Sequence, residues 1–473
     1  MKKTGNFPIQ LNSNDLRKIL QIALSRGGDF SDLFLEYRID RSILMEEDLI
    51  KESAETITMG LGIRVIKKDQ TGYAYTNDLS TEKINKVALA AAAIAGSNGK
   101  KTSRIYLKHF RPRKDVALAR KAATSLPLSE KIDLVQRAYL SALKHNPSIK
   151  KVQVAYGESL QQVWLLNSEG ISVVDSRPMV KLVVMALAEK NGRWESGFFG
   201  GGGRVDLNYF YHQLTPEKIG LEAAREACLL LEAIEPPAGE LPVVLAPGHS
   251  GVLIHEAVGH LLEADFIRKK TSIFWNKLGQ KVGCEQINIY DDPTLPGFRG
   301  SYNFDDEGNR AQKVLLVEKG VVSGFLLDFL SSRLMKARVN GHGRRQDFTT
   351  WPLPRMSNTF IAPGEYSPEE IIHSVKKGFY VSRLSGGQVE DSGKFTFSVT
   401  LGFLIENGQL TRPVRQATLI GTNLDILQKV KMVGSDLEFG LQTGTCTKEG
   451  QDVPVSDGCP TLKISRMTIG GIK

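Results

Sequence analysis

The stretch EPPAG at residues 235–239 divides the sequence into two parts with different patterns. Consecutive prolines followed by a glycine end a helix and mark a loop between structural units. Before this stretch, segments with helical spacing alternate with strand-like segments, whereas strand-like segments dominate after it. We therefore predict an α+β fold, with an N-terminal α/β domain over residues 1–238 and a C-terminal domain rich in antiparallel β-structure over residues 239–473.

The N-terminal part contains a clear hairpin pattern. Residues 56–66 and 72–76 alternate as strands do and flank a polar turn, which predicts a sheet that contains this hairpin. Residues 32–37 and 42–45 are predicted as two separate strands. The four glycines at residues 200–203 predict a flexible turn rather than a phosphate-binding loop, because neither a P-loop lysine nor a helical pattern directly follows them.

The composition is that of an ordinary globular protein. Of the 473 residues, 41% are hydrophobic and 24% are charged, and the length predicts two or three domains. No apolar run is long enough for a membrane span, and no signal-peptide pattern follows the first lysines. Four cysteines are too few for a disulfide scaffold. We therefore expect a cytoplasmic protein with reduced thiols and no membrane association.

The formal net charge of +9 raises the question of a nucleic-acid partner. The basic residues are dispersed in short runs and form neither a basic tail nor a single helical stripe. Such a distribution is typical of a solvated basic surface. We therefore expect no nucleic-acid partner.

The segment HEAVGH at residues 255–260 is the strongest chemical motif in the sequence. His255 and His260 are candidate metal ligands, and Glu256 is a candidate base for a metal-activated water. The histidines are five residues apart rather than the usual four, which places them roughly 140° apart on a regular helix. A π-bulge would bring them together, and Gly259 lowers the barrier to that distortion. The spacing alone equally fits a buried helix with two hydrogen-bonded histidines.

The segment around this motif and several other segments, in order along the chain, resemble those of the TldD/PmbA family of cytoplasmic metallopeptidases. HEAVGHLLEAD resembles the HExxxH metal-binding signature of that family. The resemblance covers roughly residues 30–95 and 240–473, and it is weaker between them. The other matching segments are GLGIRVIKKDQTGYAYTNDLS, YNFDDEG, GHGRRQ, PLPRMSNTFI, GGQVEDSGKFTF, ENGQLTRPVRQATLIG, KEGQDVPV and GCPTLKISRMTIGG.

The resemblance implies a third metal ligand and a mechanism. Family members have a cysteine before a run like KEGQDVPV, which here is Cys446, followed by Thr447 where a glycine is common. Two imidazoles and a thiolate form a set that suits Zn²⁺ and leaves a fourth position open. The zinc ion would polarise water and the scissile carbonyl, and Glu256 would act as general base and then as acid. Cys459 is a competitor for the ligand role, although a buried free thiol is the simpler interpretation.

Other polar residues in the C-terminal blocks have two possible roles each. His342 is either a catalytic group that stabilises the oxyanion or a structural loop residue. Arg344 and Arg345 either bind a peptide carboxylate or form ion pairs. The cluster DDE at residues 305–307 either binds a second cation or forms a solvated or arginine-paired turn.

The resemblance also implies a substrate and a partner. Family members are thought to digest unfolded peptides inside a chamber formed by two subunits, and strand edges can bind such peptides through the main chain. This sequence has the metal motif and is therefore similar to the catalytic, TldD-like subunit. It would act as a homodimer or as a heterodimer with a related subunit that lacks the motif. The alternative is a non-catalytic, peptide-binding or chaperone-like subunit of the same family.

Overall fold

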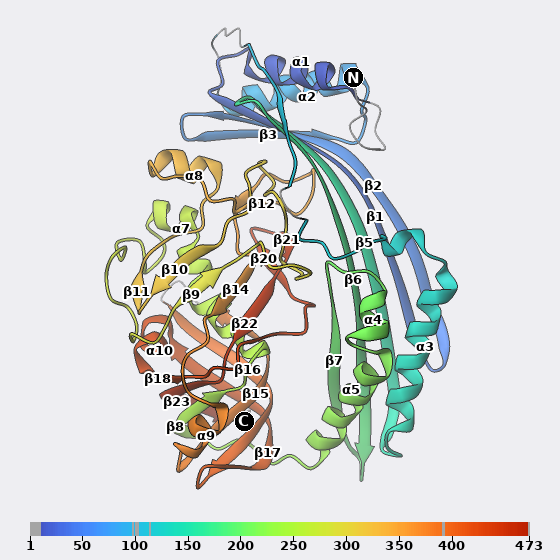
Figure 1. Cartoon of the computed structure of the whole chain (residues 1–473), viewed down its shortest axis with the longest axis vertical. Helices are drawn as coiled ribbons and strands as arrows, with labels where there is room; N and C mark the ends of the chain where they lie inside the picture. The colour runs from blue at the N-terminus through green and yellow to red at the C-terminus, as the bar shows by residue number, and fades with distance from the viewer. Residues whose placement is uncertain (1–10, 97–98, 100–103, 113–114, 390–392, 472–473) are drawn as a thin grey trace.

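The computed structural model describes residues 11–96, 99, 104–112, 115–389 and 393–471 (Figure 1). The first residues, for which no targeting segment is predicted, lie outside this description. Helices and long, mainly antiparallel strands confirm the predicted α+β fold. The α-helices are α1 (Ser13–Leu24), α2 (Thr81–Ile94), α3 (Leu128–Lys144), α4 (Asn208–His212), α5 (Pro216–Leu231), α6 (Val252–Ile254), α7 (Ala264–Lys269), α8 (Phe329–Leu334), α9 (Pro368–His373) and α10 (Asn423–Lys429).

The strands fall into an N-terminal set, β1 to β7, and a C-terminal set, β8 to β23. The first set is β1 (Phe30–Glu46), β2 (Leu49–Lys67), β3 (Gln70–Thr76), β4 (Lys108–Phe110), β5 (Ile149–Asn167), β6 (Ile171–Lys190) and β7 (Arg193–Gly203). The second set is β8 (Gly239–Leu245), β9 (Ile289–Asp291), β10 (Val314–Glu318), β11 (Val321–Val322), β12 (Gly343–Arg344), β13 (Leu353–Pro354), β14 (Asn358–Ile361), β15 (Lys377–Val389), β16 (Lys394–Glu406), β17 (Gln409–Thr422), β18 (Val430–Val433), β19 (Glu438–Phe439), β20 (Thr445–Lys448), β21 (Gln451–Pro454), β22 (Ser456–Cys459) and β23 (Leu462–Gly471).

Strands β1 to β7 form one sheet, which we call the N-terminal sheet. Its order is β3-β2-β1-β5-β6-β4, and β7 also pairs with β6. The predicted hairpin is present as β2 and β3, with Lys67 paired to Gln70 across the turn. The two short strands predicted over residues 32–45 are one strand, β1, which is paired along most of its length with both β2 and β5. The prediction of a break was wrong because backbone pairing on both sides carries the strand through its polar middle.

The glycine run at residues 200–203 is also not the predicted turn. It is the end of strand β7, and each glycine pairs with a residue of β6 from Val180 to Val183. A Cβ atom on Gly202 would lie 2.1 Å from the Val180 carbonyl oxygen, which is too close for a side chain. The glycines therefore permit a close approach of two backbones rather than a flexible loop.

The N-terminal sheet has helices on one face and the C-terminal part on the other (Figure 1). Val152 and Val154 of β5 pack with α3 and α5, and Leu166 farther along β5 packs with α1 and α2. Val163 and Leu165 alternate to the opposite face, as side chains of a strand do, and they pack against C-terminal phenylalanines. The two faces of the sheet thus bury different parts of the chain.

Two larger sheets make up most of the C-terminal part. One has the order β11-β10-β9-β14-β22-β19. The other has the order β17-β16-β15-β8-β23-β18, and β17 also pairs with β23, so that five of its strands form a closed ring. Their shared core includes Leu253, Ile254, Ala257 and Val258, which belong to the segment that contains the HEAVGH motif. The motif is therefore fixed by the largest core of the molecule.

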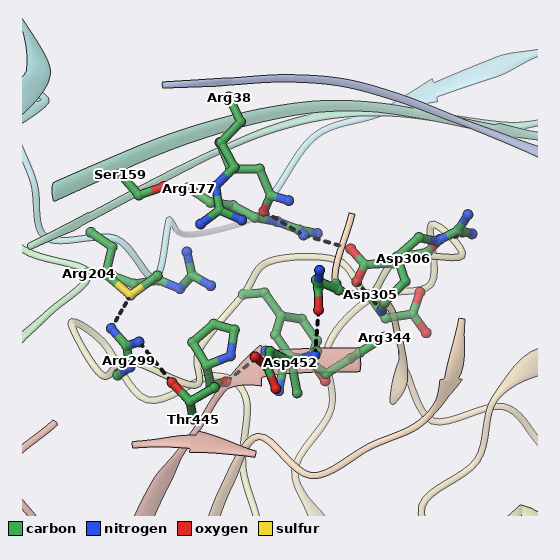
Figure 2. A pocket seen from close by; sticks show the side chains of 17 residues that line it. Arg38, Ser159, Arg177, Arg204, Arg299, Asp305, Asp306, Arg344, Thr445 and Asp452 are labelled. Carbon is green, nitrogen blue, oxygen red and sulfur yellow. Dashed lines mark hydrogen bonds and ion pairs between the residues drawn. The ribbon is translucent and has the colours of Figure 1, made fainter. Parts of the chain in front are cut away.

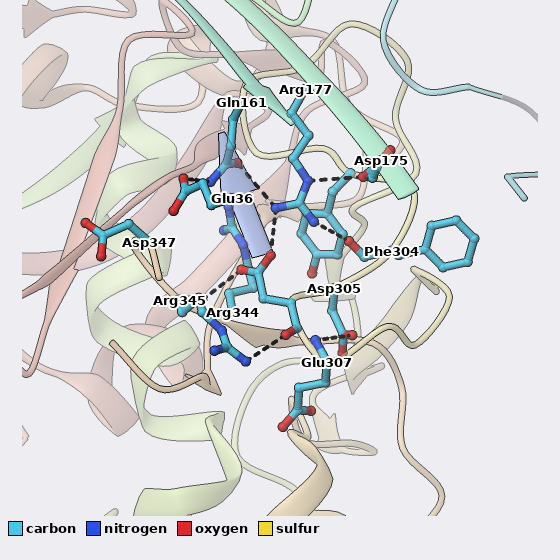
Figure 3. Close-up of polar contacts among 12 residues, drawn as sticks. Glu36, Gln161, Asp175, Arg177, Phe304, Asp305, Glu307, Arg344, Arg345 and Asp347 are labelled. Atoms are coloured by element: carbon cyan, nitrogen blue, oxygen red, sulfur yellow. Dashed lines mark hydrogen bonds and ion pairs between the residues drawn. The ribbon is translucent and has the colours of Figure 1, made fainter. Parts of the chain in front are cut away.

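Buried ion pairs connect the N-terminal sheet to the C-terminal part (Figure 3). Arg64 of β2 binds Glu307 at 2.7 Å, and Arg177 of β6 binds Asp306 at 2.6 Å. Arg345 reaches back to Asp32 of β1 at 3.1 Å. Two residues of the acidic cluster at residues 305–307, Asp306 and Glu307, are therefore paired with arginines. Removing one partner of such a pair leaves an uncompensated buried charge. Loss of the residue on either side would therefore destabilise the contact between the N-terminal sheet and the C-terminal part.

Glu36 makes the stability of this contact dependent on pH. Its carboxylate accepts hydrogen bonds from Gln161 Nε2 at 2.7 Å and from Phe348 N at 2.8 Å. Burial nevertheless raises the pKa of Glu36 from 4.5 to about 7, because the two hydrogen bonds and the charge of Arg38 lower it by less, and the charge of Asp347 adds to the rise. A glutamate with a raised pKa binds a proton more tightly in the folded than in the unfolded chain. Its contribution to stability is complete below pH 4.5 and is lost as the pH rises through 7.

We expect Glu36→Gln to weaken this pH dependence, because glutamine resembles the protonated glutamate at every pH. Between pH 4.5 and 7.5, the wild type should lose on the order of 3 kcal/mol more unfolding free energy than the variant. Urea denaturation at several pH values measures the difference. The exposed Glu285→Gln serves as a matched control and should follow the wild type. Parallel curves for wild type and Glu36→Gln would contradict the assignment.

Among the residues that the structure describes, no helix combines the length and apolar character needed to cross a lipid bilayer.

Candidate metal centre

The HEAVGH motif adopts the widened backbone that its spacing requires. Residues His255–Gly259 form a π-helix, η3, between helix α6 and a 3₁₀ turn, η4, at His260–Leu262. One π-turn brings residues five positions apart onto the same face, so the two imidazoles approach each other. Their ring centroids are 5.0 Å apart and the ring planes are nearly perpendicular, at 85°. The helical backbone is interrupted after η4, because Glu263 is extended before α7 begins.

Close packing holds this backbone in place. A Cβ atom on Gly259 would lie 2.0 Å from the Met356 sulfur, so the loop before β14 occupies the space that a side chain would need. A Cβ atom on Gly251 would similarly lie 2.6 Å from the Gly458 nitrogen of β22. Glycine at position 259 therefore serves close packing against Met356, whereas its backbone is right-handed helical, with φ −56° and ψ −57°, and does not itself require glycine.

Strand β20 brings Cys446 to the two histidines. It pairs with β21, and Cys446 is opposite the buried Val453. The Cys446 Sγ atom lies 3.3 Å from His260 Nε2, and one ligand atom from each of Cys446, His255 and His260 lies within 4.8 Å of the others. Within the described part of the chain, no second group of three such side chains has this geometry. The three predicted ligands thus come together from segments almost 190 residues apart.

Each histidine is oriented by a carboxylate. His255 Nδ1 lies 2.7 Å from Asp457 Oδ1, and His260 Nδ1 lies 3.0 Å from Glu263 Oε2. Glu263 also binds Lys448, at 2.9 Å. A carboxylate on one ring nitrogen fixes the tautomer and leaves the other nitrogen free to bind a metal. This arrangement is typical of histidines that coordinate metal ions.

The charges of the group favour a thiolate. Burial alone would raise the pKa of Cys446, but His255 and His260 lower it well below its ordinary range. Arg355 adds positive charge by placing Nη2 3.3 Å from the Cys446 sulfur and 2.6 Å from its carbonyl oxygen. Burial would lower the pKa of His260, yet Glu263 and Cys446 raise it to about 10. The site therefore stabilises the deprotonated sulfur that a metal ligand requires.

Glu256 and His342 occupy different surroundings. The Glu256 side chain is 31% exposed, and its Oε2 atom lies 3.8 Å from His260 Nε2, beside the ligand group. His342 is fully buried, with Nε2 2.9 Å from Asp291 and Nδ1 3.1 Å from the Asn340 carbonyl oxygen. The structure therefore places Glu256 at the group, whereas both nitrogens of His342 already contact protein atoms.

Cys459 lies apart from the three-residue group. It is completely buried, its Sγ atom donates to the Pro460 carbonyl oxygen at 3.0 Å, and burial raises its pKa. These properties are those of a packed thiol rather than a ligand.

Three residues that orient the group were not predicted from the sequence. Glu263 follows His260 by three residues, a helical spacing that could have suggested the contact. Asp457 is distant in sequence from His255, which it contacts, and Arg355 is distant from Cys446, so no local pattern marks either contact.

Comparison with known proteins identifies the class to which this site belongs. Models of the PmbA/TldA metallopeptidase match the chain in three places: domain 1 at residues 31–95, the central domain at 121–231 and the C-terminal domain at 238–471. A Haemophilus influenzae protein named Metalloprotease TldD homolog is 37% identical over 98% of this chain and 97% of its own length. The chain therefore belongs to the PmbA/TldD metallopeptidase family and is TldD-like.

Two further similarities concern the metal and the fold. A Saccharolobus solfataricus protein named Zinc metalloprotease TldD homolog is 26% identical, with 96% of this chain and 99% of that protein aligned. The crystal structure of TldE from Thermococcus kodakarensis has the same fold, with a TM-score of 0.76 and 21% identity over 97% of this chain and 100% of that one.

Proposed function

We propose that this chain is a zinc-dependent peptidase that hydrolyses unfolded or small peptides. The observation that carries the proposal is the convergence of His255, His260 and Cys446, with their ligand atoms within 4.8 Å, next to the partly exposed Glu256. A site of this kind combines three metal ligands with a carboxylate near the position of a reacting water.

The donor set fits zinc. Two nitrogen donors and one thiolate suit a tetrahedral Zn²⁺ and leave a fourth position for water or substrate. The name of the Saccharolobus solfataricus relative, a zinc metalloprotease, supports the same metal. Bound zinc would supply Lewis-acid chemistry that lowers the pKa of water and polarises a carbonyl group.

The protein residues would supply proton transfer and orientation. We assign Glu256 as the base that accepts a proton from water and then delivers it to the leaving amine. Asp457 and Glu263 hold the imidazoles that would bind the metal. We assign His342 a positioning role, because Asp291, which it binds, also accepts a hydrogen bond from the Ser357 backbone near Arg355.

The proposed substrate is an extended peptide. The two-stranded sheet β20-β21, which contains Cys446, pairs with no third strand in the part of the chain that the structure describes. An unpaired strand edge binds extended peptides through main-chain hydrogen bonds, with little demand on side chains. We further propose a chamber formed by two subunits, either two copies of this chain or this chain with a TldE-like partner, to which the Thermococcus kodakarensis fold similarity points.

Domain division and location complete the proposal. We propose that the C-terminal domain begins at residue 239, because α5 ends at Leu231 and β8 begins at Gly239. All four cysteines are free, which supports a reducing compartment such as the cytoplasm.

Removal of the metal tests the proposal. We expect a chelator to reduce hydrolysis of an unfolded peptide to background and stoichiometric Zn²⁺ to restore it, because the assigned base has no activated water without the ion. Metal analysis and peptide cleavage are measured on the same samples, and circular dichroism verifies that the metal-free chain remains folded. A folded, metal-free chain that cleaves peptides normally would refute the proposal. Peptide binding without cleavage in the zinc-loaded protein would instead favour a chaperone-like subunit.

A further inference from the structure

A cavity rich in arginine lies between the N-terminal sheet and the C-terminal part (Figure 2). Its volume is about 300 Å³. Strands β1, β5 and β6 and Arg204, directly after β7, form one side, and loops with strand β12 and the hairpin β20-β21 form the other. The arginines that line it are Arg38, Arg177, Arg204, Arg299, Arg344 and Arg345, and the acidic residues are Asp305, Asp306 and Asp452.

The most informative residue that lines this cavity is Arg204. It directly follows the glycine run of β7, and its backbone is fixed by bonds to Gly297 and Leu118. Only 3% of the residue is exposed, and its Nε atom is buried without a partner. Among the described residues, its guanidinium group has no hydrogen-bond or ion-pair partner. Burial, followed by repulsion from Arg177, lowers the pKa of Arg204 to about 9, which reflects an uncompensated charge.

Two neighbouring arginines also lack a carboxylate partner among the described ion pairs. Arg299 binds the Gly444 carbonyl oxygen at 2.7 Å and the Thr445 hydroxyl at 3.4 Å. Arg344 binds the carbonyl oxygens of Met356 and Pro454, at 2.5 and 2.8 Å. These neutral acceptors hold the two guanidinium groups in place and leave their charge unbalanced.

The three carboxylates of the cavity bond to residues other than Arg204. Asp306 is paired with Arg177 at 2.6 Å, and Asp305 accepts hydrogen bonds from Asn309 and the Gly343 backbone. Asp452 accepts a hydrogen bond from the Thr447 hydroxyl at 2.5 Å. Because six arginines line the cavity with only three aspartates, positive charge is in excess around Arg204.

From this arrangement we infer that the cavity binds a compact oxyanion, a phosphate or a carboxylate group, with Arg204 as a direct ligand. Guanidinium groups match the planar pairs of oxygen atoms in such anions and bind them through charge-assisted hydrogen bonds. An anion of this size fits the cavity and supplies the partner that Arg204 lacks. The cavity is separate from the candidate metal centre, although Thr445 in its wall precedes Cys446 on strand β20.

Thermal unfolding with inorganic phosphate tests the inference without relying on hydrolysis. At constant ionic strength, we expect phosphate, but not chloride, to raise the Tm of the wild type by several degrees. Arg204→Met should weaken the apparent phosphate affinity about tenfold or more, because it removes the unpaired guanidinium group. Arg204→Lys, which keeps the charge but not the two-pronged geometry, should give an intermediate loss. The exposed Arg225→Met makes the same charge change on α5 and should bind phosphate like the wild type.

A wild type with no shift beyond that in chloride would overturn the inference. Equal phosphate affinity in wild type and both Arg204 variants would also overturn it, since it would place the anion elsewhere, for instance on the metal. A peptide with a free C-terminus and its C-terminal amide distinguish the source of the anion. Stronger stabilisation by the free acid that is lost in Arg204→Met assigns the cavity to a peptide carboxylate. Equal effects of the two peptides, beside a phosphate shift that depends on Arg204, assign it to a free small anion.

Discussion

Glu256→Gln is expected to retain one metal ion per chain and to hydrolyse an unfolded peptide about 10²–10⁴-fold more slowly than the wild type. Glutamine has nearly the same shape but cannot accept a proton from water. The Glu256 side chain does not belong to the three-residue ligand group, so the metal content should not change. The measurement combines metal analysis with steady-state cleavage of the same peptide.

The matched control for this variant is Glu285→Gln, an identical substitution at a side chain that is 79% exposed. It should cleave peptides at the wild-type rate. A Glu256→Gln variant that keeps full activity would exclude Glu256 as the base. Loss of the metal in Glu256→Gln would instead assign this carboxylate to coordination.

Cys446→Ser is expected to lose most of its bound zinc and, with it, peptide hydrolysis. A change in a residue that merely orients a ligand typically weakens metal affinity 10–100-fold, so the loss of a direct thiolate ligand should cost at least about 100-fold. A serine hydroxyl is a poor replacement, because His255 and His260 stabilise the charged form of the sulfur. Zinc affinity is measured by competition with a chromophoric chelator.

Cys459→Ser provides a control within the same region of the C-terminal part. This thiol is buried and contacts the Pro460 carbonyl oxygen, so the variant should keep its zinc even if its stability falls. Both variants are compared by thermal unfolding to separate metal loss from unfolding. Normal zinc affinity and activity in Cys446→Ser would remove Cys446 from the proposed site.

The sequence predicted local features of the candidate site but not the residues that orient its candidate ligands. The five-residue histidine spacing requires a widened turn, and the π-helix η3 provides it. This requirement could be recognised because it depends on the geometry of one short segment, whereas the way in which the chain meets it could not be read from the sequence. The contact between His255 and Asp457 spans 202 residues, and that between Arg355 and Cys446 spans 91. Such contacts arise from sheet topology, which a single sequence without distant pairing information does not specify.

The two wrong predictions about the fold, a break in β1 and a turn at residues 200–203, have the same origin. Strand β1 is continuous because its polar middle is paired on both sides, and the glycines of β7 form a strand because they pack against β6. In both cases tertiary pairing overrides the local preference of the residues. The hairpin β2-β3 was predictable because its two strands are neighbours in sequence and its turn is short.

The buried arginine–carboxylate pairs restrict how relatives of this chain can exchange segments. Arg64 and Arg177 come from one half of the chain, and their partners Glu307 and Asp306 come from the other. A chimera that joined halves of two homologues would be destabilised wherever one half kept such a charge and the other half lacked its partner. Recombination within the family should therefore retain such positions as matched sets, which gives the two halves a shared evolutionary history.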